Sequence, residues 1–291
     1  MRIFVTGSES FIGRELIRKC LLRGIEVSGC DLVSQKSQNY DFRSVDIRSR
    51  ELRNIIPENI DALVHLAAII TRDCEANPTL CYDVNLSGTV NVADSARERN
   101  AKQIIFASTE WVYGQFKPGE IKNEDSLIDP TRLDTDYALS KILSEFTLRE
   151  RHNITFIPTT ILRFGIIYGP RTGPASAVDS LFAQVSAEDE IKVNSLMTGR
   201  HFIHVSDICE GIIKSFGLPG LNIINLEGDR MITLGEVIET SKKLLGKNPR
   251  VIETNPSNIS ERRVSNSRAK KILGWRPEID LETGLKALIK Q

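Results

Sequence analysis

Short apolar runs alternate with amphipathic stretches through the first half of the chain. Helical periodicity separates several of these runs. The predicted strands are Ile3–Thr6, Ile25–Cys30, Ala62–Leu66, Gln103–Ala107 and Thr155–Leu162, and the predicted helices are Phe11–Arg23, Leu80–Arg99 and Tyr137–Arg151. Strands separated by helices are typical of right-handed βαβ units, so the pattern predicts an α/β fold with a doubly wound parallel sheet.

The pattern changes after Gly169. Shorter helices are predicted at Val205–Phe216, Leu234–Leu245 and Leu281–Ile289, with a single strand at Ile223–Asn225. We therefore expect a core domain over residues 1–169 and a smaller α/β domain mainly over residues 170–291, with segments that cross back to the core.

Charge and composition exclude several classes of protein. The 291 residues carry 38 basic and 38 acidic side chains, a balance that argues against a nucleic-acid partner. No apolar run approaches the roughly 18 residues of a membrane span, so we expect no membrane partner. The five cysteines are scattered and never spaced as CxxC, which favours buried free thiols in a reducing cytoplasm. Without a Cys/His/Asp cluster, no metal is expected.

A glycine-rich turn leads from the first strand into the first helix. Gly7 permits a tight turn and Gly13 permits close packing of helix on strand, while the helix N-terminus offers N–H groups to a pyrophosphate. Asp31 ends the second strand, where a carboxylate accepts hydrogen bonds from a ribose 2′-hydroxyl and repels a 2′-phosphate. The arrangement predicts a Rossmann-type NAD site; the alternative for Asp31 is a turn cap.

Tyr137 and Lys141 lie four residues apart, on one face of a predicted helix. A tyrosine with a pKa near 10 is a poor base at neutral pH. A nearby ammonium, aided by an oxidised nicotinamide, is expected to lower the pKa of Tyr137. Tyr137 could then take a proton from a substrate hydroxyl while a hydride moves to the nicotinamide.

Several motifs, in order along nearly the whole chain, resemble the extended short-chain dehydrogenases, which include nucleotide-sugar epimerases and dehydratases. The matching segments are Thr6–Gly13 (TGSESFIG, for TGxxGFIG), Asp46–Arg48, His65–Ala68, Asn85 with Gly88 and Thr89, Leu162–Arg163 with Tyr168–Arg171, Arg200–Asp207 and Leu273–Pro277. Ser10 departs from the pattern because it replaces the middle glycine, where its Cβ would narrow the approach to the phosphates.

The resemblance implies an NAD site, a catalytic hydroxyl and a homodimer. The implied cofactor residues are Gly7, Ser10, Phe11, Ile12, Gly13, Asp31, Asp46, Ile47, Leu66, Ala67, Ala68, Asn85, Tyr137 and Lys141. Thr109 matches the catalytic hydroxyl, which would hydrogen-bond the reacting oxygen; the alternative is that it only caps a loop. Residues 1–169 would bind NAD and residues 170–291 the substrate.

The segment after Thr109 favours one reaction of the family. Related dehydratases carry an acid and a base directly before the VYG sequence, but here Trp111 precedes Val112, and an indole cannot move protons. This favours an NAD-dependent epimerase acting on a nucleotide-sugar at C4, through a transient keto-sugar. The alternatives are a keto-sugar reductase or dehydratase of the same family, and a non-catalytic NAD-binding sensor.

Nucleotide-sugar binding requires cations for the diphosphate. The candidate substrate residues are the four arginines Arg171, Arg200, Arg262 and Arg263, together with Glu110. Guanidinium groups suit phosphate through bidentate hydrogen bonds. Ile166 stands where many UDP-sugar epimerases carry a substrate-binding asparagine, so the sequence leaves the sugar and the nucleotide open.

Overall fold

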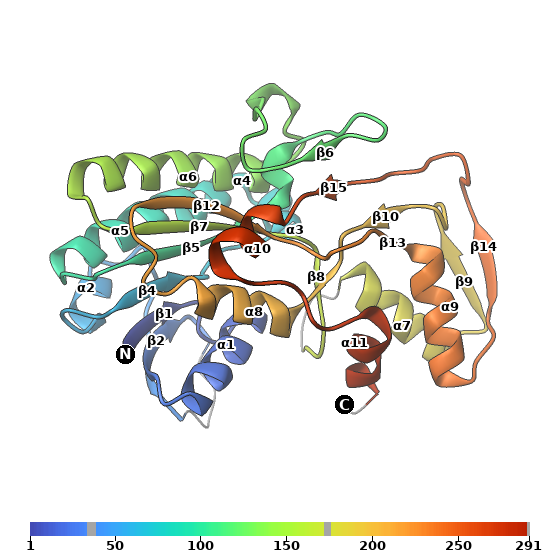
Figure 1. The fold of residues 1–291 in the computed structure, drawn as a ribbon, viewed down its shortest axis with the longest axis horizontal. Coiled ribbons are helices and arrows are strands. Elements are labelled where there is room, and N and C mark those ends of the chain that lie inside the picture. The colour runs from blue at the N-terminus through green and yellow to red at the C-terminus, as the bar shows by residue number, and fades with distance from the viewer. Residues whose placement is uncertain (34–38, 172–175, 290–291) are drawn as a thin grey trace. The chain divides into compact units, whose positions relative to one another are not determined.

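A seven-stranded sheet forms the centre of the computed structural model, which describes residues 1–33, 39–171 and 176–289 (Figure 1). The strand order is β12-β7-β5-β4-β1-β2-β3, and neighbouring strands from β7 to β3 run parallel. The strands are β1 (Arg2–Thr6), β2 (Glu26–Asp31), β3 (Asp41–Ser44), β4 (Ala62–His65), β5 (Ile104–Thr109), β7 (Thr159–Phe164) and β12 (Leu221–Leu226). The predicted doubly wound α/β fold is confirmed.

Helices cover both faces of this sheet. In Figure 1, α5 (Gly88–Glu98) and α6 (Asp136–Thr155) lie on one side of the strands and α1 (Phe11–Leu22) lies on the other. The shorter helices α2 (Leu52–Ile55), α3 (Thr71–Ala76) and α4 (Pro78–Tyr82) lie in the connections. The core between the sheet and α5 and α6 includes Phe4, Leu63, Val92, Phe106 and Leu148, whose burial is the main source of stability.

The largest differences from the predicted boundaries concern one helix and one strand. The helix predicted over Leu80–Arg99 is divided into α4, a π-helical turn (Asp83–Ser87) and α5, and such turns frequently mark functional sites. The strand predicted from Thr155 begins at Thr159, because α6 continues to Thr155 and Phe156 ends it in the left-handed conformation, with φ of 57°. Strand β3 was not predicted, because its residues are largely exposed and lack an apolar pattern.

The chain divides into two compact units. Unit 1 comprises Met1–Gln115, Ser126–Phe164 and Cys209–Ile224, and unit 2 comprises Phe116–Asp125, Gly165–Ile208 and Asn225–Gln291. The elements of unit 2 include β6 (Ile121–Lys122), β8 (Ile167–Tyr168), α7 (Ala177–Ala187), β9 (Glu190–Val193), β10 (Gly199–Arg200), β11 (Ile203–His204), β13 (Ile232–Thr233), α9 (Leu234–Leu245), β14 (Arg250–Glu253), β15 (Arg263–Val264), α10 (Ser267–Leu273) and α11 (Leu281–Leu288).

Unit 2 has its own apolar core, in which Val178 and Phe182 of α7, Ile238 of α9 and Leu285 of α11 are buried with Tyr168. Helix α8 (Val205–Lys214) contributes residues to both units.

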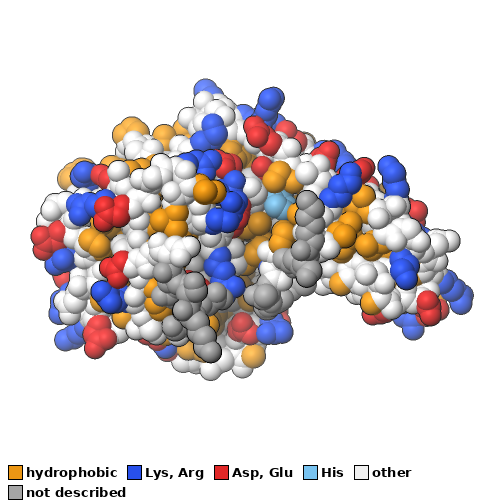
Figure 2. Space-filling view, turned by 90° about the horizontal axis from the view of Figure 1, so that it is seen from below, with side chains coloured by type: hydrophobic (Ala, Val, Ile, Leu, Met, Phe, Trp, Pro, Cys, Tyr) orange, Lys and Arg blue, Asp and Glu red, His pale blue; other side chains and the backbone are white. Residues whose placement is uncertain are grey.

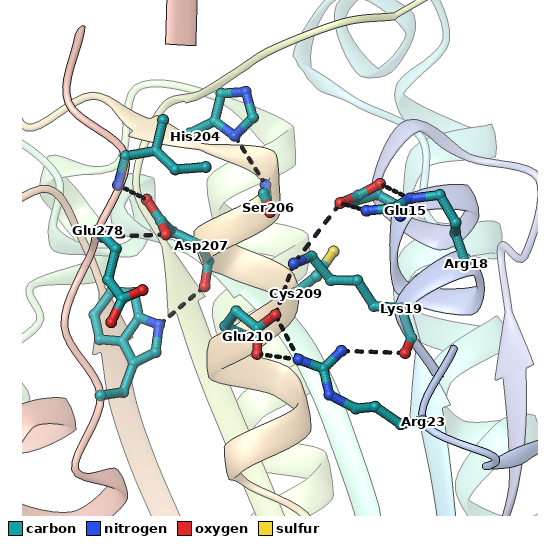
Figure 3. A network of polar contacts seen from close by, with 12 residues as sticks. Glu15, Arg18, Lys19, Arg23, His204, Ser206, Asp207, Cys209, Glu210 and Glu278 are labelled. Atoms are coloured by element: carbon teal, nitrogen blue, oxygen red, sulfur yellow. Dashed lines mark hydrogen bonds and ion pairs between the residues drawn. The ribbon is translucent and has the colours of Figure 1, made fainter. Parts of the chain in front are cut away.

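Polar contacts of α8 fix segments within each unit (Figure 3). In unit 2, the carboxylate of Asp207 accepts hydrogen bonds from the backbone N–H groups of Glu278 and Ile279, at 3.2 and 3.1 Å. In unit 1, Glu210 forms ion pairs with Lys19 and Arg23 of α1, at 2.6 and 2.8 Å. Each set of contacts holds a distant segment of the chain against α8.

The surface carries both signs of charge. Figure 2 shows Lys and Arg intermixed with Asp and Glu across the face that it draws, as the zero net charge leads us to expect. Within the described parts of the chain, no helix combines the length and the apolar character that crossing a membrane requires.

The cysteine prediction is wrong for two of the five residues. Cys74 of α3 and Cys81 of α4 form a disulfide, whereas Cys20, Cys30 and Cys209 are buried free thiols. The chain reverses at Asn77 and Pro78 between the two helices, which brings residues seven positions apart into contact. A spacing of seven gave no motif, so only the fold reveals the pair. The prediction of a cytoplasmic location relied on free thiols and loses that support.

Candidate active site

The glycine-rich turn is built so that only glycine fits at two of its positions. Gly7 has a φ of +70°, and a Cβ there would lie 2.6 Å from the backbone nitrogen of Ala67, just after β4. A Cβ at Gly13 would lie 2.3 Å from the carbonyl oxygen of Gly7. The turn is therefore pressed against α1 and against the end of β4, which is the backbone cradle that a dinucleotide pyrophosphate requires.

Ser10 fits the turn without strain and begins α1. Its φ and ψ of −67° and 167° are ordinary extended values, and its hydroxyl oxygen accepts the N–H of Gly13 at 3.1 Å. Serine thus acts as the N-cap of the helix, ahead of Phe11 and Ile12. The cap uses one N–H group of the helix terminus, which leaves the helix dipole to attract an anion.

Asp31 lies at the end of β2, beside the glycine-rich turn. Its carboxylate accepts hydrogen bonds from the backbone N–H of Glu9, at 3.0 Å, and from Leu32 and Val33, at 2.7 and 3.3 Å. The capping role considered from the sequence is therefore present. The bond to Glu9 also places this carboxylate at the turn, where a ribose recognition group is expected.

Most of the remaining predicted cofactor residues follow β3 and β4. Leu66, Ala67 and Ala68 directly follow β4. Ile47 is buried and would meet any side chain placed at Gly88. Asp46 forms an ion pair with Arg48 at 2.6 Å, and hydrogen bonds from Arg48 lower the pKa of Asp46.

Asn85 is buried in the π-helical turn and connects several segments. Its side chain accepts the N–H of Ile69 at 2.9 Å and donates to the Ile69 carbonyl at 3.0 Å. It also donates to the Ser140 hydroxyl on α6, at 3.1 Å. These bonds hold the segment after β4 and the start of α6, so Asn85 shapes the predicted cofactor site through neighbouring residues.

The three predicted catalytic residues are brought together within unit 1. Thr109 ends β5, and Tyr137 begins α6, whose N-cap is Thr135. A hydrogen bond joins the hydroxyls of Thr109 and Tyr137. The Thr109 oxygen also accepts the N–H of Trp111 at 3.3 Å, so the residue caps the loop and reaches the phenol at the same time. Lys141 follows one helical turn later on the same face of α6.

Burial governs the ionisation of this pair. It raises the pKa of Tyr137 to about 12, opposed by the hydrogen bond from Thr109. It lowers the pKa of Lys141 to about 7, opposed by the carboxylate of Glu145. In the protein chain by itself, burial therefore opposes the lowering of the Tyr137 pKa that is expected from Lys141 together with an oxidised nicotinamide, because a low-dielectric environment disfavours the phenolate.

Aromatic and imidazole groups line the other sides of Lys141. Its Nζ lies 4.4 Å from the centre of the Phe106 ring on β5. His65 at the end of β4 contacts the Thr6 hydroxyl at 2.7 Å and the Thr89 hydroxyl at 3.0 Å. Burial, together with the charge of Lys141, lowers the pKa of His65 to about 3. The imidazole is therefore neutral at physiological pH.

A 3₁₀ turn (Glu110–Tyr113) follows Thr109. Glu110 is buried and Trp111 is 37% exposed. The two side chains that follow Thr109 thus differ in burial as well as in chemistry, and the indole carries no acid or base function.

A buried ion pair close to the predicted catalytic residues was not predicted from the sequence. Glu145 and Arg163 are each 3% exposed and interact at 2.6 Å. Arg163 belongs to a recognised motif. Glu145 follows Lys141 by four residues, and this helical spacing could have placed Glu145 on the same face of the helix as Lys141. Their meeting depends on how α6 lies against β5 and β7, which the sequence does not reveal.

Three of the four candidate arginines lie close together in unit 2. Arg200 on β10 donates to the Ser260 carbonyl at 2.6 Å and to the Ser260 hydroxyl at 2.9 Å. A β-bridge between Gly199 and Glu261 places β10 beside the start of the Arg262–Arg263 pair.

The two arginines of this pair differ in their surroundings. The Arg262 guanidinium lies 4.6 Å from the centre of the Phe116 ring, and Arg263 pairs with Glu261 at 3.0 Å.

Arg171 has different partners from these three residues. It forms an ion pair with Asp179 of α7 at 2.9 Å and donates to the Ile167 carbonyl at 2.6 Å. Asp179 also forms a capping box with Ser176 at the start of α7. Arg171 therefore stabilises the junction of β8 and α7, and a substrate-binding role for it gains no support from these contacts.

No group of His, Cys, Asp or Glu side chains with a metal-binding arrangement occurs in residues 1–33, 39–171 or 176–289. The groups that the site offers for chemistry include the phenol, ammonium and hydroxyl groups of Tyr137, Lys141 and Thr109, together with a backbone cradle for a dinucleotide.

Comparison with known proteins assigns the family. Residues 3–219 match the model of the NAD-dependent epimerase/dehydratase family. The chain is 30% identical to a UDP-glucuronate 4-epimerase of Thermodesulfobacterium geofontis, over 98% of this chain and 94% of that protein.

Two solved structures share the fold. A UDP-glucose 4-epimerase of Thermus thermophilus in complex with NAD matches with a TM-score of 0.85 and 25% identity, over 99% of both chains. A UDP-glucose 4-epimerase of Thermotoga maritima with UDP-glucose matches with a TM-score of 0.88 and 23% identity, over 100% of this chain and 98% of that one. The chain belongs to the NAD-dependent epimerase/dehydratase family, and NAD is its cofactor.

Proposed function

We propose that this protein is an NAD-dependent epimerase that inverts C4 of a UDP-linked sugar through a transient 4-keto-sugar. The observation that carries the proposal is the contact between the Thr109 and Tyr137 hydroxyls, with Lys141 one helical turn away. The similarity to a UDP-glucuronate 4-epimerase supports the choice of nucleotide and carbon.

Tyr137 is proposed to remove the proton from the C4 hydroxyl and later to return it. When bound, NAD would supply reversible hydride acceptance at C4 and a positive ring that would favour the phenolate form of Tyr137. Lys141 adds a second positive charge on the same side of α6. Thr109 hydrogen-bonds the reacting oxygen and shares its proton with Tyr137, in the manner of general acid–base catalysis.

The cofactor is proposed to lie along the carboxyl ends of β1, β2 and β4. The N-terminus of α1, from Ser10 to Gly13, would hold the pyrophosphate, and Asp31 would hold the adenosine ribose. The fit rests on the cradle that a Cβ at Gly7 or Gly13 would fill. A carboxylate at Asp31 would exclude a 2′-phosphate by like-charge repulsion.

Unit 2 is proposed to bind the nucleotide-sugar. Arg200 and Arg262 are the best candidates for the diphosphate, because a β-bridge holds their strands side by side. The backbone N–H of Arg262 also donates to the Gly199 carbonyl, at 3.4 Å. Guanidinium groups placed in this way can form bidentate hydrogen bonds with phosphate oxygens.

The proposal is tested by proton NMR of the purified protein with UDP-, GDP- and dTDP-sugars, catalytic NAD and no other reductant. The panel includes UDP-glucose and UDP-glucuronate. We expect a UDP-sugar to give a new anomeric signal of its C4 epimer, approaching an equilibrium ratio. Each sugar is also incubated with NAD alone, which is expected to leave the spectrum unchanged.

The same spectra distinguish the alternative reactions. Conversion of the sugar's C6 hydroxymethyl group to a methyl group, with loss of water, would indicate a dehydratase, and loss of the C6 carboxylate as carbon dioxide would indicate a decarboxylase. An unchanged spectrum for every sugar would contradict the epimerase proposal, and pre-formed keto-sugars with NADH would then test the reductase alternative.

We also propose that two copies of the chain associate through α6. Leu143 and Phe146 lie one turn apart on this helix and are 36% and 48% exposed, an apolar pair of the kind that packs against a partner helix. We expect a homodimer by sedimentation equilibrium, and a monomer when both residues are replaced by Glu. Leu127→Glu, at an 89% exposed position away from α6, is the matched control and should remain a dimer.

A further inference from the structure

A buried charged cluster, formed by Ser108, Glu145 and Arg163, lies behind the catalytic residues of unit 1. The Arg163 Nη2 and Nε atoms donate to the two Glu145 carboxylate oxygens, at 2.6 and 3.0 Å. The Ser108 hydroxyl donates to the same carboxylate at 2.5 Å. All three residues are 3% exposed. Because burying an ion pair often stabilises a fold less than apolar residues of similar volume, the cluster calls for a role other than stability.

The cluster connects three parts of unit 1 that carry the catalytic residues. Ser108 and Arg163 are cross-strand partners in the register of β5 and β7, so their side chains reach Glu145 from neighbouring strands. Ser108 directly precedes Thr109. Arg163 also donates to the Tyr113 hydroxyl, at 3.0 Å, in the 3₁₀ turn that follows Thr109.

Consecutive residues of β5 therefore hold α6 at two points. Thr109 bonds to Tyr137, and Ser108 bonds to Glu145, eight residues further along the helix. Tyr137 and Glu145 flank Lys141 at four-residue spacing, so all three lie on one face. A rotation or a shift of α6 by one residue would break both contacts. The Ser108–Glu145 contact thus holds α6 in the position in which Thr109 can bond to Tyr137.

The charge of Glu145 also acts on Lys141. Burial lowers the pKa of Lys141, and the Glu145 carboxylate opposes that effect. The other groups that face Lys141 are the neutral His65 on β4, the Phe106 ring on β5 and the Tyr137 phenol. Glu145 supplies the negative charge that faces Lys141, and the same carboxylate is paired with Arg163.

We propose that Glu145 is a positioning residue for epimerisation: anchored by Arg163 and Ser108, it fixes α6 against the end of β5 and keeps Lys141 charged beside Tyr137. The effect of Glu145 on catalysis rests on the function proposed above, whereas the effect of Glu145 on Lys141 is independent of that function.

The first test measures the ionisation of Lys141 without substrate. Protein labelled with ¹³C at lysine Cε is titrated by NMR, and the Lys141 signal is assigned by its loss in Lys141→Met. Glu145→Gln is expected to move the Lys141 midpoint to lower pH. Glu145→Asp, which keeps the charge, and Ser108→Ala, which removes only a hydrogen bond, are expected to titrate near the wild-type midpoint.

The second test measures kcat and KM across pH with the UDP-sugar identified by NMR. Glu145→Asp is expected to lower kcat about tenfold with KM nearly unchanged, because the shorter side chain cannot hold Ser108 and Arg163 together. Glu145→Gln should also move the lower pH limit of kcat upward, since phenolate formation loses the support of a charged Lys141.

Two results would overturn the proposal. One is a folded Glu145→Gln protein whose Lys141 midpoint equals that of wild type, because a purely structural residue would change only thermal stability. The other is a wild-type kcat in Glu145→Asp, and this measurement tests the proposal even if the Glu145→Gln variant does not fold. Absence of epimerisation by the wild-type protein, together with the expected titration shifts, would count against the proposed function and leave the role of Glu145 toward Lys141 standing.

Discussion

Replacing Tyr137 by Phe is expected to lower kcat by about 10³-fold, with KM for the UDP-sugar within a few-fold of wild type. The substitution keeps the ring at the start of α6 and removes the hydroxyl that contacts Thr109. The proton of the sugar hydroxyl then has no positioned acceptor. The residues proposed to bind the nucleotide do not include Tyr137, so the loss is expected to fall on the chemical step.

The measurement is the initial rate of epimer formation by NMR at saturating UDP-sugar. Tyr168→Phe is the matched control, because this tyrosine is buried in unit 2 and its hydroxyl donates to the Asp280 carbonyl at 3.3 Å. It should keep kcat within about twofold of wild type while losing about 1 kcal/mol of stability. A Tyr137→Phe enzyme within tenfold of the wild-type rate would show that another group moves the proton.

Much of the fold follows from local sequence patterns. The glycine-rich turn, the buried strands and the capped helices each depend on residues within one element, so their order was predictable. Boundaries failed where longer-range packing decided the outcome. Helix α6 continues to Thr155 and shortens the following strand, and the π-helical turn around Asn85 interrupts a pattern that looks continuous in sequence.

The candidate site shows the same division. Tyr137 and Lys141 were selected by their helical spacing and Thr109 by the family resemblance, and the fold brings Thr109 into contact with Tyr137. The contact of Glu145 with Arg163 depends on strand register and helix orientation, and the Cys74–Cys81 disulfide depends on a chain reversal. Arg171 was a substrate candidate because guanidinium suits phosphate, and its ion pair with Asp179 accounts for it structurally.

Replacing Arg163 by Met is expected to lower the free energy of unfolding by about 3–5 kcal/mol, the usual cost of leaving one partner of a buried ion pair behind. Met has a similar length and fills the space on β7, so the loss comes from the uncompensated Glu145 carboxylate. The measurement is urea unfolding followed by circular dichroism. Arg53→Met is the matched control: its pair with Glu98, at 3.4 Å, is about half exposed, and its removal should cost less than about 1 kcal/mol.

Combining Arg163→Met with Glu145→Gln separates stability from catalysis. The double variant removes both charges of the Arg163–Glu145 ion pair, so most of the stability lost in Arg163→Met is expected to return. If the single Arg163→Met variant loses less than about 1 kcal/mol, the buried carboxylate has found another partner and this account of the pair fails. A double variant that unfolds like wild type but epimerises slowly would mean that the cluster contributes geometry and charge at the active site more than it contributes stability to the fold.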